Sequence, residues 1–145
     1  MTTVLVADHL LLRILLDDDP ASLRPTSAKV ATTGLWYHRL CRVLNQDGVI
    51  GSMSRRLGEV DDPVAARVVG AVIELPEAIE LLSLRSLGWA MGELIADGVR
   101  LNLLSLEALA AARHLAADIC LAEEDQNDPL LAAASAFGIR VRTVS

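Results

Sequence analysis

The stretch Thr3-Val4-Leu5-Val6-Ala7-Asp8 decides the class of fold. Its first five residues are apolar or β-branched throughout, which is typical of a strand buried on both faces of a sheet. The leucine-rich segment 9–16 follows at once and predicts a helix. Because parallel strands need long and usually helical connections, a buried strand that runs straight into a helix favours a parallel sheet.

Strand and helix patterns alternate along the rest of the chain. Short apolar or β-branched segments predict further strands at residues 28–33, 79–82, 118–122 and 139–144. Helical periodicity and capping signals predict helices at residues 34–46, 61–74, 105–116 and 129–138, and from Ser83 or Ser86 to Ala96. The alternation predicts one three-layer α/β domain over residues 1–145, with a central, mainly parallel sheet flanked by helices.

The composition narrows the possible environments and partners. The 145 residues are 52% hydrophobic with a mean hydropathy of +0.40, which excludes intrinsic disorder and predicts a homo-oligomer, most simply a dimer. We expect its interface at residues 35–44 or 81–94. The chain lacks a run of about 18 uncharged apolar residues, so no membrane span is predicted. No export signal is recognisable, so a cytoplasmic protein with reduced cysteines is expected. The net charge of −6 argues against indiscriminate binding to nucleic acid.

Acidic residues lie where the first and fourth predicted strands end. Asp8 follows the first strand, while Glu124 and Asp125 follow the fourth and Asp128 comes just beyond them. Glu107 is expected in the first turn of the helix before the fourth strand. Functional groups gather at the carboxyl ends of parallel strands. Clustered carboxylates repel one another unless a hard cation such as Mg²⁺ or Mn²⁺ lies between them, so these acids predict a metal site.

Each of these acids also has a structural interpretation. Glu107 can stabilise the start of its own helix, and the acidic segment 123–128 can be a solvated loop. Asp8 lies between an apolar strand and a leucine-rich helix, so it is expected to be partly buried and to need a partner. The aromatic segment 36–39 can stack on unpaired bases, although aromatics at helical spacing more often belong to a core or a dimer interface.

The order of features resembles that of the PIN domain, a metal-dependent ribonuclease fold found in many toxin–antitoxin systems. The resemblance rests on four segments: Val4-Leu5-Val6-Ala7-Asp8-His9-Leu10-Leu11-Leu12, Glu107-Ala108-Leu109-Ala110-Ala111-Ala112, Ile119-Cys120-Leu121-Ala122-Glu123-Glu124-Asp125, and the helix, glycine and strand of residues 130–144. It implies a Mg²⁺- or Mn²⁺-dependent endoribonuclease that hydrolyses phosphodiesters of single-stranded RNA and has an antitoxin-like protein partner. The implied catalytic and metal-binding residues are Asp8, Glu107, Glu124 and Asp125, with Asp128 as a further metal ligand.

Two positions depart from the family pattern. His38 or Arg39 stands where the resemblance leads us to expect a glutamate, and Ala122 stands where it leads us to expect threonine or serine. The alternative is therefore a degenerate, non-catalytic PIN-like module for binding or assembly. A salt-bridged site with Arg39 or another arginine in the metal position would favour this alternative, whereas intact acid geometry with a bound divalent ion would favour the ribonuclease. A small-ligand-binding α/β domain is a third hypothesis.

Overall fold

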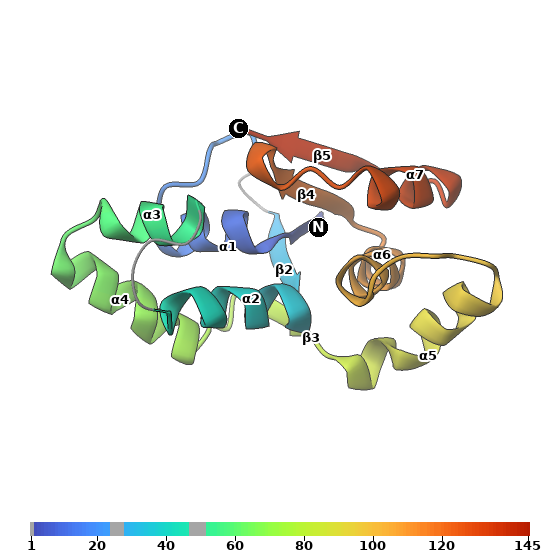
Figure 1. The fold of residues 1–145 in the computed structure, drawn as a ribbon, viewed down its shortest axis with the longest axis horizontal. Helices are drawn as coiled ribbons and strands as arrows, with labels where there is room; N and C mark the ends of the chain where they lie inside the picture. Colours follow the sequence, from blue (N-terminus) through green and yellow to red (C-terminus); the bar gives the residue numbers. More distant parts are fainter. Residues whose placement is uncertain (1, 24–27, 47–51) are drawn as a thin grey trace.

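A parallel five-stranded sheet forms the centre of the protein (Figure 1). The computed structural model describes residues 2–23, 28–46 and 52–145. The strands are β1 (Thr3–Val6), β2 (Lys29–Thr33), β3 (Ile79–Leu82), β4 (Asp118–Ala122) and β5 (Val141–Val144), and they lie in the order β3-β2-β1-β4-β5. Every neighbouring pair of strands is parallel. The predicted fold class is therefore confirmed.

Helices cover both faces of this sheet. They are α1 (Asp8–Leu15), α2 (Gly34–Leu44), α3 (Ser52–Gly58), α4 (Asp62–Ile73), α5 (Leu84–Ala96), α6 (Leu103–Leu115) and α7 (Asp128–Ala136), with a 3₁₀ turn, η1 (Glu123–Asp125), after β4. The central strand β1 shows how the layers form. Leu5 packs into one apolar cluster with residues of α5, α6 and α7, while Val4 and Val6 pack into a second cluster with residues of α1, α3 and α4. Successive side chains of a strand point to opposite faces, so β1 is buried on both.

Several predicted boundaries differ from the structure by one or two residues, and two of the differences have a clear local cause. Helix α6 begins at Leu103 rather than Ser105, because the Asn102 side chain accepts a hydrogen bond from the Ser105 backbone N–H at 2.8 Å. Glu107 therefore does not lie in the first turn of its helix, and that prediction was wrong. Strand β5 is shorter than predicted, because the Ile139 N–H still bonds the Ala134 carbonyl at the end of α7. The strands at 79–82 and 118–122 have the predicted bounds.

Within the part of the chain that the structure describes, every helix is too short or too polar to cross a lipid bilayer.

Candidate functional site

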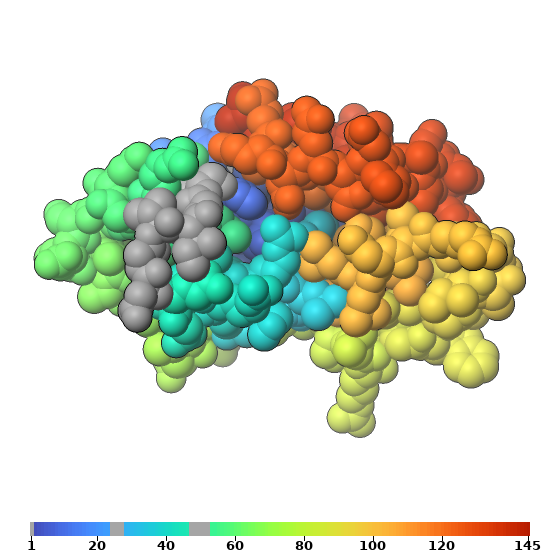
Figure 2. Space-filling model, viewed as in Figure 1, coloured from blue at the N-terminus to red at the C-terminus, as the bar shows by residue number. Residues whose placement is uncertain are grey.

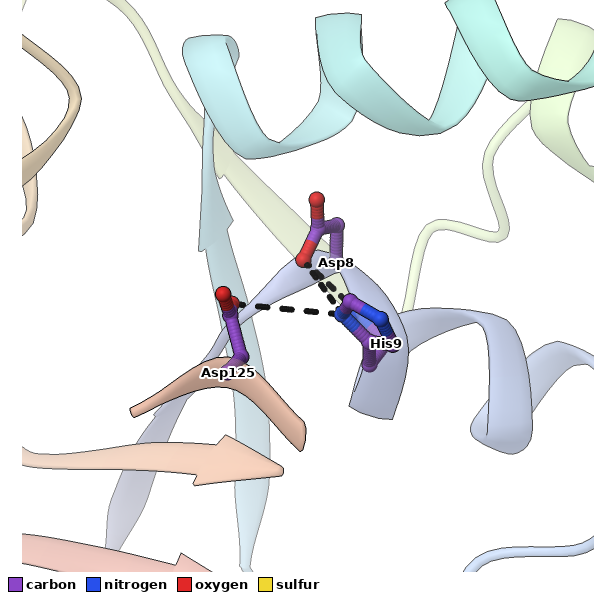
Figure 3. Close-up of side chains that lie close together, drawn as sticks. All are labelled: Asp8, His9 and Asp125. Atoms are coloured by element: carbon purple, nitrogen blue, oxygen red, sulfur yellow. Dashed lines mark hydrogen bonds and ion pairs between the residues drawn. The ribbon is translucent and has the colours of Figure 1, made fainter. Parts of the chain in front are cut away.

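The carboxyl edge of the sheet brings together Asp8, His9 and Asp125 (Figure 3). Asp8 and His9 open α1 directly after β1, and Asp125 lies in η1 directly after β4. Since β1 and β4 are parallel neighbours, their carboxyl ends meet at the same edge. One ligand atom from each of the three side chains lies within 4.8 Å of the other two. The sheet topology thus places two of the predicted acids, and one histidine, close enough to act on the same group.

Asp8 is fully buried, and its two carboxylate oxygens have different partners. Oδ1 accepts a hydrogen bond from the His9 backbone N–H at 2.9 Å and lies 3.2 Å from Nδ1 of the His9 ring. Oδ2 lies 3.0 Å from Nε of Arg39. This second contact is an ion pair without hydrogen-bond alignment, since Oδ2 accepts no hydrogen bond from the described residues. Asp8 is therefore charge-compensated while one of its buried oxygens keeps open lone pairs.

Arg39 reaches this edge from α2 and contacts both carboxylates. Its Nε lies 3.0 Å from Oδ2 of Asp8, and its Nη2 lies 3.9 Å from Oδ1 of Asp125. The guanidinium therefore spans the space between the two acids. The side chain is 34% exposed, so it enters the site from the solvent side. A permanent positive charge lies at the place where clustered carboxylates would otherwise call for a cation.

The protonation of His9 and Asp125 reflects the same cluster. The hydrogen bond to Asp8 raises the pKa of His9 above its ordinary value of 6.5, and the charges of Asp8, Asp125 and Glu124 act in the same direction, while burial opposes them. Burial raises the pKa of Asp125 above 3.8, and the nearby Asp8 charge adds to this rise, whereas Arg39 and His9 oppose it. Both groups therefore hold a proton more readily in the folded protein than in an unfolded chain.

Glu107 lies outside this cluster of ligand atoms and caps another helix. It is 1% exposed on α6, and its Oε1 accepts the Leu35 backbone N–H at 2.8 Å in the first turn of α2. Its Oε2 has no hydrogen-bond partner among the described residues. A carboxylate at the N-terminus of a helix is stabilised by the helix dipole. Glu107 thus holds the start of the helix that carries Arg39, rather than the start of its own helix.

A second group fixes the same end of α2. Thr33 is the N-cap residue, and its hydroxyl accepts the Trp36 N–H at 3.3 Å. The neighbouring Thr32 is fully buried and its hydroxyl donates to the Val6 carbonyl at 2.8 Å, which ties the end of β2 to the end of β1. The position of Arg39 therefore depends on a buried polar network at the ends of three elements. Trp36 itself is buried in the core, as the structural interpretation of the aromatic segment predicts.

The remaining predicted acids lie on the surface around the cluster. Glu124 is exposed in η1 and acts on the site through its charge, which raises the pKa of both His9 and Asp125. Asp128 is exposed in the first turn of α7, where it complements the helix dipole. His9 was not among the predicted site residues. Its only sequence signal is its position next to Asp8.

No protein-family model matches the chain, and no curated protein matches its sequence significantly. The resemblance to PIN domains therefore stays a prediction from sequence.

Proposed function

We propose that the protein is a non-catalytic PIN-like module for binding or assembly, in which Arg39 takes the place of a divalent cation. The observation that carries this proposal is the contact of one guanidinium with both carboxylates, at 3.0 Å to Asp8 and 3.9 Å to Asp125. Arg39 is also one of the two positions where the resemblance to PIN domains leads us to expect a glutamate. An acid of a metal-dependent site is thus replaced by a cation that belongs to the chain.

Electrostatics favours the internal cation over a metal ion. A divalent ion at this edge would have to displace a guanidinium that is already attached to the protein, and it would then be repelled by it. Mg²⁺ also prefers six oxygen ligands in octahedral geometry. The compact cluster offers oxygen ligands from only Asp8 and Asp125, and Glu107 is used at the start of α2. The charge of the two acids is therefore met without a metal.

A metal-dependent ribonuclease is the second candidate, and a different observation favours it. The ligand atoms of Asp8, His9 and Asp125 lie within 4.8 Å of one another, and Asp8 Oδ2 accepts no hydrogen bond from the described residues. Such a set can hold a divalent ion if Arg39 swings towards solvent, and its two carboxylates are ligands that suit Mg²⁺ and Mn²⁺. A bound metal would supply an activated water for hydrolysis of RNA phosphodiesters. An antitoxin-like partner would belong to this second function.

Calorimetric titration with Mn²⁺ separates the two functions. The variants are Asp8→Asn, Arg39→Glu and, as a matched control, Arg42→Glu, which makes the same charge change at an exposed position of α2. We expect flat titrations for the wild type, Asp8→Asn and Arg42→Glu. Arg39→Glu should bind Mn²⁺ measurably, at least about tenfold more tightly than the limit that the flat wild-type titration sets, because it turns the ion pair into a carboxylate cluster.

The opposite result would establish the ribonuclease instead. In that case the wild type binds Mn²⁺ at micromolar concentration, Asp8→Asn abolishes the binding, and the wild type cleaves single-stranded RNA only when Mn²⁺ is present.

A further inference from the structure

We propose that the outer face of α5 is a homodimer interface, in which the α5 helices of two copies pack antiparallel about a two-fold axis near Trp89. This outer face consists of Leu84, Arg85, Gly88, Trp89, Gly92, Glu93, Ile95 and Ala96, all of which are exposed. It is separate from the carboxyl-edge site and does not depend on the function proposed for that site.

Helix α5 is apolar on two sides, and the described residues cover one of them. Leu87, Met91 and Leu94 are buried against the core. On the outer face, by contrast, Trp89 is 83% exposed and Ile95 is 60% exposed. In Figure 2 the yellow segment that includes α5 forms a corner of the molecule with open space beside it. Large aromatic side chains contribute most of their stabilisation when they are buried, so an outward tryptophan on an apolar helix face marks an interaction surface.

Two glycines on this face lie where a larger side chain would fit within the single chain. Gly88 and Gly92 lie inside α5, and a Cβ atom added to either would meet nothing within 4 Å. Glycine inside a helix is less favourable than alanine, and its usual benefits are positive φ angles or the close approach of another backbone. Neither glycine has a positive φ. Gly70 on α4 has the same features, so such a glycine does not by itself identify an interface, but two of them beside the exposed Trp89 leave room for the close approach of a second helix.

The glycines also shape a hollow beside Trp89. The hollow has a volume of about 270 Å³ and is lined by Gly88, Trp89, Gly92, Glu93 and Ala96. The same helix face therefore carries both a protruding aromatic side chain and a recess beside it. A two-fold axis near Trp89 places the two tryptophans side by side, each next to a recess, which is the self-complementary arrangement that a symmetric dimer requires.

The charges on this face favour a second copy of the chain as the partner and favour an antiparallel orientation of its α5. Arg85 precedes Trp89 by four residues, and Glu93 follows it by four. In an antiparallel pair centred on Trp89, Arg85 of each copy lies opposite Glu93 of the other. The two residues are about 12 Å apart along their own helix, so they cannot pair within one copy. Neither makes an ion pair with the described residues of its own chain. A parallel pair would instead place like charges together.

The first experiment fills the recess and measures the oligomeric state. Leucine is a better helix former than glycine, so Gly92→Leu should keep the monomer folded while it blocks the second helix. The matched control is Gly70→Leu on α4, because Gly70 is also an exposed helical glycine with nothing within 4 Å. Sedimentation equilibrium at up to about 0.1 mM should show a dimer for the wild type and for Gly70→Leu. Gly92→Leu should associate at least about tenfold more weakly without a lower melting temperature as a monomer.

The second experiment reverses the charges. Arg85→Glu and Glu93→Arg should each weaken the dimer, and the double variant should restore its association to near the wild-type level, because it exchanges the two ends of both ion pairs. A monomeric wild type, or a Gly92→Leu protein that associates like the wild type, overturns the interface. A double variant that associates no better than the single variants overturns the antiparallel register.

Discussion

Two aspartate–arginine clusters lie at opposite ends of the neighbouring strands β1 and β4, and they differ in burial. At the carboxyl edge, Asp8 is fully buried and pairs with Arg39, which is 34% exposed. At the amino edge, Asp118 opens β4 and pairs with Arg140, which is 71% exposed. Arg142 from β5 also lies 3.3 Å from Asp118. Both clusters pair a carboxylate with guanidinium groups, but the Asp8 side chain is 0% exposed whereas the Asp118 side chain is 27% exposed, so water reaches the carboxylate of Asp118 alone.

The difference in burial decides what each ion pair does. A surface pair is screened by water and contributes little, whereas a buried charge that loses its partner is strongly destabilising. The Asp8 carboxylate therefore requires a cation, either Arg39 or a metal ion, while the Asp118 carboxylate does not. Buried carboxylates of this kind identify the edge at which a site can form, and exposed ones of the same composition do not.

The largest expected effect comes from removing the cation at the buried cluster. Arg39→Met should lower the free energy of unfolding by roughly 3 kcal/mol, at the lower end of the range for broken buried pairs because the guanidinium is partly exposed. Urea unfolding at pH 7 measures it. The double variant Asp8→Asn, Arg39→Met should recover much of the loss, since the unpaired charge is then gone. A single variant as stable as the wild type would mean that Asp8 does not depend on Arg39.

The strand pattern predicted that β1 and β4 end at the same edge of the sheet, and the sequence spacing predicted that Asp8 and Asp125 lie there. Asp8 follows a fully apolar strand, and Asp125 follows a second one, so the parallel sheet brings them together. Short-range patterns of this kind determine where strands end. They do not determine which side chain from a third element reaches the same point, and so the contact of Arg39 with both acids could not be derived from spacing.

Long-range contacts determine the surroundings of the residues that the sequence did not place correctly. Glu107 caps α2 through Leu35, which lies 72 positions earlier in the chain, and no local signal reveals that contact. The two tryptophans show the same limit. Trp36 is 2% exposed and Trp89 is 83% exposed, although both lie in helices with apolar neighbours. Helical periodicity predicts which residues share a face, but only the packing of the whole chain decides which face is covered.

The pH dependence of folding stability should distinguish the two clusters, with an effect of intermediate size. His9 has a raised pKa, so its protonated form stabilises the fold below pH 6.5, and this contribution is lost as the pH rises through the folded pKa. The folded protein should therefore lose stability over this window of rising pH. Melting temperatures measured from about pH 5 to about pH 9 should fall with rising pH, and this slope is visible because the range spans the titration of histidine at about 6.5.

Histidine variants identify the residue that causes this pH dependence. His9→Gln should reduce it, whereas His38→Gln, a matched change at an exposed position of α2, should keep it. The Asp118 cluster contains only arginine as a cation, and arginine does not titrate in this range. A slope that survives in His9→Gln and disappears in His38→Gln would place the pH response outside the buried cluster.

The smallest expected effect is at the Asp118 cluster, where Arg140 is 71% exposed and Arg140→Met should leave the urea midpoint indistinguishable from that of the wild type. Arg140 donates from Nε to Asp118 at 2.9 Å, but water can replace this contact because the side chain is mostly exposed.

Arg142 is the matched comparison. It contacts the same Asp118 and also donates to the backbone carbonyls of Ser22 at 3.1 Å and Leu23 at 2.8 Å, so it ties the segment before β2 to the edge strand β5. Arg142→Met should therefore lower the midpoint while Arg140→Met does not. If Arg140→Met proves as damaging as Arg39→Met, exposure does not set the strength of these pairs, and the contrast between the two edges of the sheet must have another cause.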